Sequence, residues 1–435
     1  EPGLATEWAY LDDGYTLEMK LRQGVKFHDG SDFTAEDVKA TIEHMSDPQG
    51  TRGGDWSQQY YVDIVDDYTV RIYPSSKTPQ GILINMLSLT GMLSADDVAD
   101  EAKLKSRLNG TGPYKMVKYE NETVYLEAFE DYYDKENAAK IKYVEFRYVP
   151  ESQARLAALQ SGEAHLIERV EAEQLPIIEA DPNLKTTVGY VNEQKYMVFK
   201  NTQPPMDNPL VRKAIAHAID VETIVNDIMG GYARVADSWL PATAEHYSPA
   251  ANFPTYDVEK AKALLAEAGY PNGEGLPTLT YITSTGFYPK TKEYGEYIVS
   301  CLEKIGIKVD FQPMESAGWS DALYQEDSCH MMDTGWMNES NEDNIALYVC
   351  YHTTGLMDFS SHPAVDAALE KETATMDPAE RKAVIQNELW PALVENMSTY
   401  PLFDSTCIYA YSSDLQGFKV LPTSSMSFWE YSFAE

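Results

Sequence analysis

Residues 15–45 change from a two-residue to a helical repeat of apolar side chains, and this change limits how the segment can fold. An apolar residue occupies every second position of YTLEMKLR, which is the pattern of a strand with one buried face. Turn residues in QGVKFHDG then end the alternation. Thr34 and Asp37 have the spacing of a capping box, which marks the start of a helix. The segment is therefore predicted to fold as strand, tight loop and helix, with His28 as a loop residue rather than a catalyst or metal ligand.

Strands and helices alternate along most of the chain. The segment 141–167 is predicted to form a strand, a helix and a second strand. Asn208 is placed to cap a helix whose first residue is Pro209, and the segment 257–311 repeats the alternation. Units of this kind build a mostly parallel sheet covered by helices, so the sequence predicts an α/β fold.

Length and charge limit the classes of function. A chain of 435 residues is too long for one ordinary core and suggests about three domain-sized units. The 34 Lys and Arg residues against 69 Asp and Glu residues give a net charge of −35. Such a surface repels phosphate backbones and anionic lipid headgroups, so no nucleic acid or membrane face is expected as a partner. No apolar run approaches the ~18 residues that a membrane-spanning helix needs.

Several phrases of the sequence resemble one family of proteins. They are LRQGVKFHDGSDFTAEDV with GLATEW and DDG upstream, GTGPY before two strands, ARLAALQSGE, and the segment 196–241. Together they resemble the bacterial extracytoplasmic solute-binding proteins of the peptide/nickel type (family 5), which serve ABC importers. The resemblance implies an α/β, two-lobed periplasmic-binding-protein-like fold (type II, cluster C) with an extra subdomain on lobe I. It also implies a monomer that captures a ligand between the lobes by hinge closure and delivers it to an ABC permease.

The resemblance also implies a domain division and a cellular location. The accessory subdomain of lobe I is expected at 1–108, its main subdomain at 109–195, lobe II at 196–404, and a return to lobe I at 405–435. Two crossings between lobes have the geometry of a hinge. About fifty family residues, the export signal and any lipid-bearing cysteine would lie upstream of residue 1. The protein is expected outside the cytoplasm, either periplasmic or lipid-anchored on the outer face of the cell membrane.

A strand that ends in Gly-Trp and enters a carboxylate-rich loop, MMDTGWMNESNEDN at 331–344, is the first candidate for a ligand site. Ligands of open α/β sheets gather at the carboxyl ends of strands. Trp336 offers a flat apolar face, and Glu339, Glu342 or Asp343 could accept a hydrogen bond from an ammonium group. In peptide binders that this chain resembles, an aspartate three residues after the tryptophan holds the peptide amine. Glu339 takes that place here, which predicts an amine-bearing ligand held by a longer stem.

A second departure from the family concerns the ligand carboxylate. Dipeptide binders of the family grip it with an arginine whose place here is Thr285, and no arginine occurs between Arg234 and Arg381. Short peptides held at both ends are therefore disfavoured, and longer peptides held by backbone contacts, or another ligand, fit better. Further candidates for ligand contact, each equally explained by packing, are Trp239, Trp56, Tyr60 and Tyr61.

No motif points to catalysis. The sequence holds no GxSxG, HExxH or P-loop, and its 8 histidines lack metal-ligand spacing, since even His352 and His362 are ten apart. No enzyme activity, cofactor or metal site is therefore predicted. An oligosaccharide is the main rival ligand, because 30 Tyr and 7 Trp offer stacking faces. The resemblance implies a nickel complex and haem as further possible ligands, and a hydrolase is the remote alternative. Cys329 and Cys350 either pair, as in an exported protein, or remain thiols.

Overall fold

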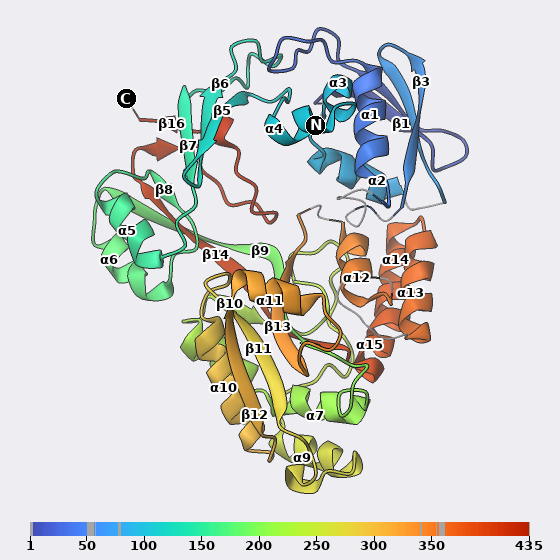
Figure 1. Ribbon diagram of the computed structural model, residues 1–435, viewed down its shortest axis with the longest axis vertical. Coiled ribbons are helices and arrows are strands. Elements are labelled where there is room, and N and C mark those ends of the chain that lie inside the picture. Colours follow the sequence, from blue (N-terminus) through green and yellow to red (C-terminus); the bar gives the residue numbers. More distant parts are fainter. Residues whose placement is uncertain are drawn as a thin grey trace. The chain divides into compact units, whose positions relative to one another are not determined.

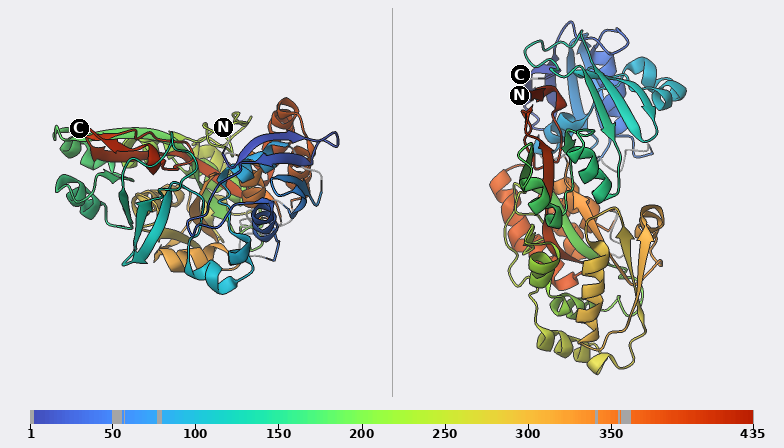
Figure 2. Two further views of the ribbon diagram at one scale, coloured as in Figure 1. Left: turned by 90° about the horizontal axis from the view of Figure 1, so that it is seen from above. Right: turned by 90° about the vertical axis from the view of Figure 1, so that its left-hand side faces the viewer.

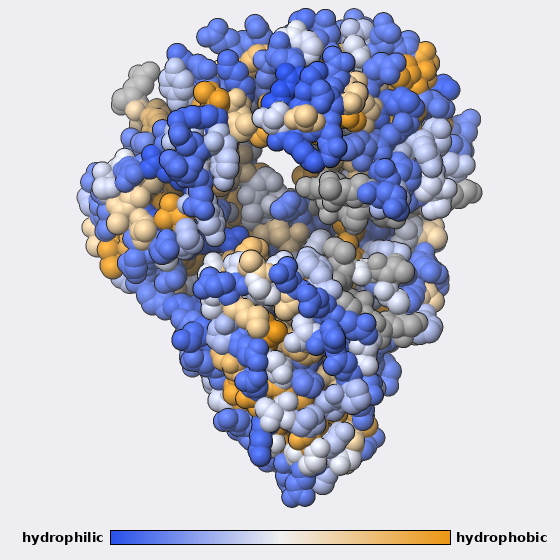
Figure 3. Space-filling model, in the orientation of Figure 1, coloured by the Kyte–Doolittle hydropathy of each residue, from blue (hydrophilic) through white to orange (hydrophobic). Residues whose placement is uncertain are grey.

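The chain forms two compact units. The computed structural model describes residues 3–49, 56, 58–76, 80–339, 342–353, 355 and 362–434 (Figure 1). The first unit comprises Glu1–Val149, Ser413–Lys419 and Met426–Glu435, and the second comprises Pro150–Ser412 and Val420–Ser425. Hydrophilic residues cover most of the visible face of each unit, as the net charge of −35 leads one to expect (Figure 3).

Antiparallel sheets form the framework of the first unit. One has the strand order β1-β2-β4-β3 and another the order β5-β6-β7, while β15 pairs with β16. The strands are β1 (Ala5–Tyr10), β2 (Leu17–Leu21), β3 (Tyr60–Asp66), β4 (Thr69–Pro74), β5 (Tyr114–Glu120), β6 (Thr123–Ala128), β7 (Tyr143–Arg147), β15 (Leu415–Gln416) and β16 (Ser432–Phe433). The helices are α1 (Ala35–Met45), α2 (Gln80–Leu89), α3 (Ala95–Val98), α4 (Glu101–Ser106) and the 3₁₀ turn η6 (Phe428–Glu430). The predicted strand, loop and helix are confirmed as β2 and α1, with the capping box of Thr34 and Asp37 in place.

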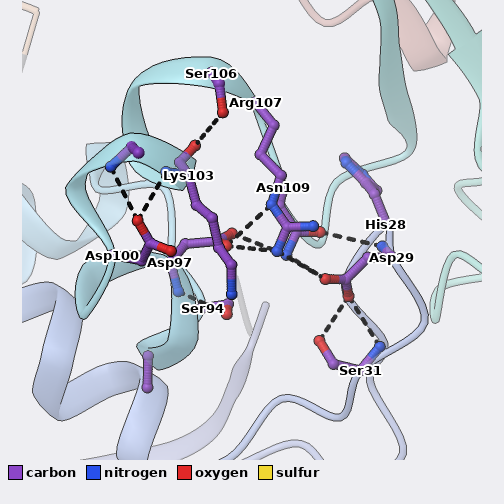
Figure 4. Close-up of polar contacts among 12 residues, drawn as sticks. His28, Asp29, Ser31, Ser94, Asp97, Asp100, Lys103, Ser106, Arg107 and Asn109 are labelled. Atoms are coloured by element: carbon purple, nitrogen blue, oxygen red, sulfur yellow. Dashed lines mark hydrogen bonds and ion pairs between the residues drawn. The ribbon is translucent and has the colours of Figure 1, made fainter.

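Two of the family-like phrases contact each other in this unit. Arg107 Nη2 donates to Asp97 Oδ1 at 2.5 Å and to Asp29 Oδ2 at 3.1 Å (Figure 4). His28 Nε2 donates to the carbonyl oxygen of Gly112 at 3.0 Å, and burial lowers the pKa of its imidazole. The FHDG loop is thereby tied to GTGPY, which confirms His28 as a structural loop residue.

A mixed sheet forms the centre of the second unit. Its strand order is β10-β14-β9-β13-β11-β12, and β8 pairs with β14 outside that path. The strands are β8 (Leu166–Ile167), β9 (Leu184–Phe199), β10 (Ala233–Val235), β11 (Leu279–Thr285), β12 (Val309–Glu315), β13 (Met331–Met337) and β14 (Thr399–Ser412). Only the β11–β12 and β11–β13 pairs are parallel among the strands that the structure describes. The prediction of a mostly parallel sheet is wrong, because long β9 and β14 return antiparallel to each other (Figures 1 and 2). The predicted strand–helix–strand unit at 141–167 likewise has its strands β7 and β8 in different sheets.

In two core clusters, a large one and a smaller one around Leu156, Ile178 and Ile408, the apolar residues of this sheet are buried by helices. They are α5 (Ser152–Gln160), η2 (Ala172–Gln174), α6 (Leu175–Glu179), α7 (Pro209–Ala218), α8 (Val221–Thr223), η3 (Ile224–Ile228), α9 (Val258–Glu267), η4 (Pro271–Gly273), α10 (Thr291–Glu303), α11 (Ser316–Leu323), α12 (Asp343–Tyr351), α13 (Pro363–Ala374), α14 (Pro378–Val384), η5 (Ile385–Leu389) and α15 (Trp390–Asn396). Asn208 caps α7 as predicted, since its Oδ1 accepts from Leu210 N at 3.0 Å.

The two strands that were expected to cross between lobes lie side by side. In the pairing of β9 with β14, Gln194 is opposite Asp404 and Lys195 is opposite Phe403. Gln194 Nε2 also donates to Asp404 Oδ1 at 2.9 Å, and both side chains are buried. The division into compact units falls at 149/150, so residues 150–195, which the resemblance assigns to lobe I, pack in the same unit as 196–404.

Candidate ligand-binding site

A cavity of about 460 Å³ opens within the second unit. Small-molecule sites in proteins range over roughly 300–1,000 Å³, so the cavity has the size of a ligand site. Its walls come from the loop before η2 and η2 itself (168–173), β9 (Val191, Glu193, Lys195), the end of η3 (Ile228, Met229, Tyr232), the turn before α10 (287–290), the end of β13 (Met337, Glu339), β14 (403, 405–409) and the segment 423–425.

A buried ion pair stands in the wall formed by β9. Lys195 Nζ lies 2.8 Å from Glu193 Oε1, and the two side chains are only 3% and 14% exposed. They share a face because side chains two apart along a strand point the same way. Ser405 Oγ donates to the same carboxylate oxygen at 2.8 Å, and Lys195 Nζ sits 2.8 Å from the ring centroid of Tyr288. Burial lowers the pKa of Lys195 to about 8, although Glu193 opposes that shift.

The glycine of the Gly-Trp phrase makes room for this lysine. Gly335 is opposite Lys195 in the β9–β13 pairing. A Cβ atom at position 335 would meet Lys195 Nζ at 2.5 Å and Cδ at 2.9 Å, closer than atoms can pack. The carbonyl oxygen of Gly335 also accepts a hydrogen bond from the Tyr288 hydroxyl at 3.0 Å. Gly335 therefore shapes the cavity wall without contributing a side chain.

The loop that follows β8 presents an arginine to the cavity. Arg169 lines the cavity with a left-handed backbone, φ +53°, which is uncommon for a residue other than glycine. Arg155 donates to the carbonyl oxygens of Glu168 (3.2 Å) and Arg169 (2.9 Å), and Val170 N donates to Ile408 O at 2.9 Å. The loop is thus held from both sides. Arg169 Nη1 donates in turn to the carbonyl oxygen of Phe287, 2.8 Å away.

A second contact joins the same two segments of the cavity wall. Lys290, the residue before α10, has its Nζ 2.9 Å from Glu173 Oε1. The hydrogen bond from Lys290 lowers the pKa of the Glu173 carboxyl group. Burial lowers the pKa of the Lys290 ammonium group, but the hydrogen bond to Glu173 and nearby carboxylates outweigh it, so that this pKa is raised. Both residues line the cavity, so the segments 168–173 and 287–290 are joined by this pair and by the Arg169–Phe287 hydrogen bond.

Of the eight ligand-contact residues predicted from the sequence, Glu339 alone lines this cavity. Its side chain is exposed, and among the described residues its carboxylate has no ion pair or hydrogen bond. Trp336 does not line the cavity, and it packs half-buried against the core. Thr285 ends β11 and does not line the cavity either, because its hydroxyl turns to the carbonyl oxygen of Met314 at 3.0 Å.

Two further predicted residues of this unit lie in its core. Trp239 is 2% exposed, donates its Nε1 to Thr399 Oγ1 at 3.1 Å, and packs 6.0 Å from the ring of Trp390. Asp343 is not in a loop but begins α12, and it is 1% exposed. Its Oδ2 accepts from the main-chain N of His246 at 2.7 Å and from Nδ1 at 3.0 Å. Both side chains are occupied by packing and internal hydrogen bonds.

The remaining predicted residues belong to the first unit. Trp56 and Tyr60 are 4% and 0% exposed, and their rings meet edge to face at 5.5 Å. Tyr61 points the other way from its strand, is 43% exposed and lies 5.8 Å from the ring of Tyr73. Trp56 and Tyr60 are therefore core residues of that unit, and Tyr61 is a surface residue.

Sequence reasoning passed over Arg169 and Lys195. Lys195 had a usable signal, because a lysine in the buried strand segment QKYMVF is rarely left without a partner or a role. Arg169 had none, since ERVE looks like any solvated turn. Its position in the cavity depends on contacts with Arg155 and Ile408 that are distant in sequence.

The four cysteines are free thiols, so Cys329 and Cys350 do not pair. Cys407 lines the cavity and is partly exposed, whereas the other three are buried. In the part of the chain that the structure describes, no group of three or more His, Cys, Asp or Glu side chains is placed to hold a metal ion. None of the described helices combines the length and apolar character that crossing a membrane requires.

A cavity of small-molecule size, walled by the strands of a mixed α/β sheet and rimmed by charged loops, is suited to binding a small solute. Residues 1–358 match the family model described as bacterial extracellular solute-binding proteins, family 5 middle. The glutathione-binding protein GsiB of Escherichia coli (strain K12) is 30% identical over 447 residues, which cover 98% of this chain and 84% of that protein. The chain therefore belongs to the family 5 bacterial extracellular solute-binding proteins.

Solved structures share the fold of this chain. The dipeptide-binding protein from Pseudoalteromonas sp. SM9913 in complex with Met-Leu has a TM-score of 0.89 at 23% identity, covering 99% of this chain and 90% of that one. The periplasmic binding protein DppA from Helicobacter pylori, in complex with the peptide STSA, has a TM-score of 0.85 at 25% identity, covering 100% and 90%. The predicted periplasmic-binding-protein-like α/β fold is confirmed. So is the predicted class of function, a solute-binding component for ABC import.

Proposed function

We propose that this chain binds a short, amine-bearing, peptide-like ligand in the cavity of its second unit and delivers it chemically unchanged to an ABC permease. The observation that carries the proposal is the state of the Glu339 carboxylate. It lines the cavity, is exposed, and among the described residues has no cationic partner. An ammonium group of a ligand supplies that partner through a charge-assisted hydrogen bond.

Three of the other four carboxylates of the cavity have close partners, and the fourth has a distant one. Glu193 pairs with Lys195 and Glu173 with Lys290. Glu171 accepts the N–H of Gln174 in a capping box, and Glu168 lies 3.8 Å from Arg169 Nε. Glu339 is thus the carboxylate with most capacity left for a ligand cation.

Size and relatives support a short peptide. A cavity of about 460 Å³ accommodates a ligand of a few residues. Glutathione, after which GsiB is named, and the Met-Leu and STSA peptides in the two structures are all short and carry an α-ammonium group. We extend this ligand class to the present chain.

The decisive test compares a pool of unmodified tripeptides with the same pool acetylated at the amine. Calorimetry of the wild-type protein should show acetylation weakening binding by about tenfold or more, the value of one charged hydrogen bond. In Glu339→Gln, unmodified peptides should bind as weakly as acetylated ones. Glu259→Gln, in the exposed Glu259–Lys262 pair on α9, is the matched control and should behave as wild type. Equal affinity of the wild-type protein for both pools would refute amine recognition.

A second candidate ligand is an oligosaccharide, because the Phe287 ring lines the cavity and is 42% exposed; one of its faces stacks on Trp319, so a sugar would stack on the other. Maltotriose, cellotriose and chitotriose serve as probes in the same calorimeter. Binding of any of them with affinity that Glu339→Gln leaves unchanged would favour this candidate over the peptide.

We also propose the position of the hinge, the oligomeric state and the cellular location of the protein. The proposed hinge lies where Gln194 pairs with Asp404 and Lys195 pairs with Phe403, at the crossings expected between lobes I and II. The family name supports an extracytoplasmic location, either periplasmic or lipid-anchored. We propose that the protein is a monomer there. Light scattering of the purified protein and fractionation of its native cells test these two points, since a stable dimer or a cytoplasmic location would contradict them.

A further inference from the structure

We propose that Arg169 binds the carboxylate of the ligand, so that Glu339 and Arg169 together select a molecule with both an ammonium and a carboxylate group. This inference rests on the proposed function and deepens it. Arginine suits the role because its planar fork matches the two oxygens of a carboxylate.

The charges around the cavity single out Arg169. Three cations line it: Arg169, Lys195 and Lys290. The two lysines each have a carboxylate within 2.9 Å, in Glu193 and Glu173. Among the described residues the ion pair of Arg169 is with Glu168 at 3.8 Å, both side chains being well exposed to solvent, and Glu193 also interacts electrostatically with its guanidinium. In the same part of the chain one of its five N–H donors is used, toward Phe287 O. Arg169 is therefore the cation with capacity to bind an incoming anion.

The backbone at this position is strained and held in place. A φ of +53° is costly for an arginine, and such strain persists only where surrounding contacts enforce it, most often at functional sites. The contacts are the Arg155 guanidinium on the carbonyl oxygens of residues 168 and 169 and the Val170–Ile408 main-chain hydrogen bond. The main chain at Arg169 is thus held in place before any ligand arrives, which reduces the entropy lost on binding.

The inference also changes what the sequence suggested about ligand length. The lack of an arginine near Thr285 disfavoured short peptides held at both ends. The fold brings an arginine to the cavity from a different part of the chain, after β8, so that a short ligand can be held at its amine and its carboxylate without one at 285.

Glycine at position 169 separates a binding role from a structural one. Glycine adopts positive φ without strain, so Arg169→Gly relieves the backbone while it removes the guanidinium. A residue kept for stability should destabilise the protein when replaced. A residue kept for binding should leave the melting temperature at or above that of the wild type and lose only the carboxylate interaction.

The experiment compares unmodified tripeptides with the same pool carrying a C-terminal amide, using wild type, Arg169→Gln and Arg169→Gly. The wild-type protein should bind the acids about tenfold or more tightly than the amides, and both variants should bring that ratio close to one. Arg71→Gln, in the exposed Arg71–Glu18 pair of the first unit, removes the same charge and should keep the wild-type ratio.

Each of the other outcomes would contradict either the role of Arg169 or the proposed function. If the wild-type protein binds acids and amides equally, it recognises no carboxylate, and the inference fails while the proposed function stands. If the ratio survives in Arg169→Gln, another residue holds the carboxylate. If Arg169→Gly melts well below the wild type with an unchanged ratio, the role is structural. If the wild-type protein binds neither pool, the proposed function itself is wrong.

Discussion

Arg155 Nη2 donates a hydrogen bond to the carbonyl oxygen of Arg169 at 2.9 Å, so one arginine fixes the main chain of the other. Arg155 also bonds the carbonyl oxygens of Pro150 and Glu168. Arg155→Ala should lower the free energy of unfolding by about 1 kcal/mol, because one partly buried and two exposed carbonyl groups lose their donor. It should also weaken binding of unmodified tripeptides more than of their amides. Urea denaturation and calorimetry measure the two effects, and Arg71→Ala serves as control. An unchanged acid-to-amide ratio would show that the Arg169 loop needs no such support.

Gly335→Ala should damage the cavity wall through a single methyl group. The added Cβ would collide with Lys195 and push its ammonium away from Glu193. We expect a loss of about 1–3 kcal/mol in the free energy of unfolding. In a Lys195→Ala background the same methyl group enters vacated space, so the second substitution should cost little. Strictly additive losses in the urea-denaturation cycle would argue against the collision.

The lowered pKa of Lys195 makes a prediction about alkaline pH. Between about pH 8, where folded Lys195 loses its proton, and about 10.4, the ordinary lysine value, only the unfolded chain retains that proton. Stability due to this residue therefore rises with pH in that window, by up to about 1.4 kcal/mol per unit. Lys200, whose pKa burial also lowers to about 8, cancels when wild type is compared with Lys195→Met. The stability of the wild type relative to Lys195→Met should grow from pH 8 to 10, and a flat difference would contradict the assignment.

Asp343→Asn should destabilise the fold and leave ligand affinity unchanged, since Asp343 bonds His246 in the core. The hydrogen bond from His246 to Asp343 raises the pKa of the imidazole above its ordinary value. The pair therefore contributes fully below about pH 6.5, and its contribution is lost as the pH rises through the higher folded value. The stability difference between wild type and variant should be largest in mild acid, at about 1–3 kcal/mol. Urea titrations at pH 5.5 and 8.5 measure it, and reduced tripeptide affinity would return Asp343 to the candidate site.

Local signals in the sequence predicted local structure well. The alternation at 17–21 and the Thr34–Asp37 capping box lead directly to β2 and α1. The Asn208–Pro209 start of α7 was equally readable. These elements depend on residues within a few positions of one another, so their determinants are neighbours in the sequence.

Features that depend on distant contacts were less predictable. Trp239 and Asp343 have the chemistry of ligand contacts, but Thr399 and His246, far away in the chain, fix them in the core. Arg169 has no local signal, and it reaches the cavity because β8 pairs with β14. The mixed sheet was missed for a similar reason, since strand direction depends on which distant strand is the neighbour.

Cys407 places a partly exposed thiol in the cavity wall, where a thiol-reactive reagent can reach it. Cys301, Cys329 and Cys350 are at most 5% exposed, so a maleimide or iodoacetamide dye should attach first at position 407. Burial raises the pKa of the Cys407 thiol, so labelling calls for mildly alkaline buffer. A fluorophore attached at Cys407 should change its emission wavelength or intensity when a ligand binds. The protein could then serve as a fluorescent sensor without any change to its sequence.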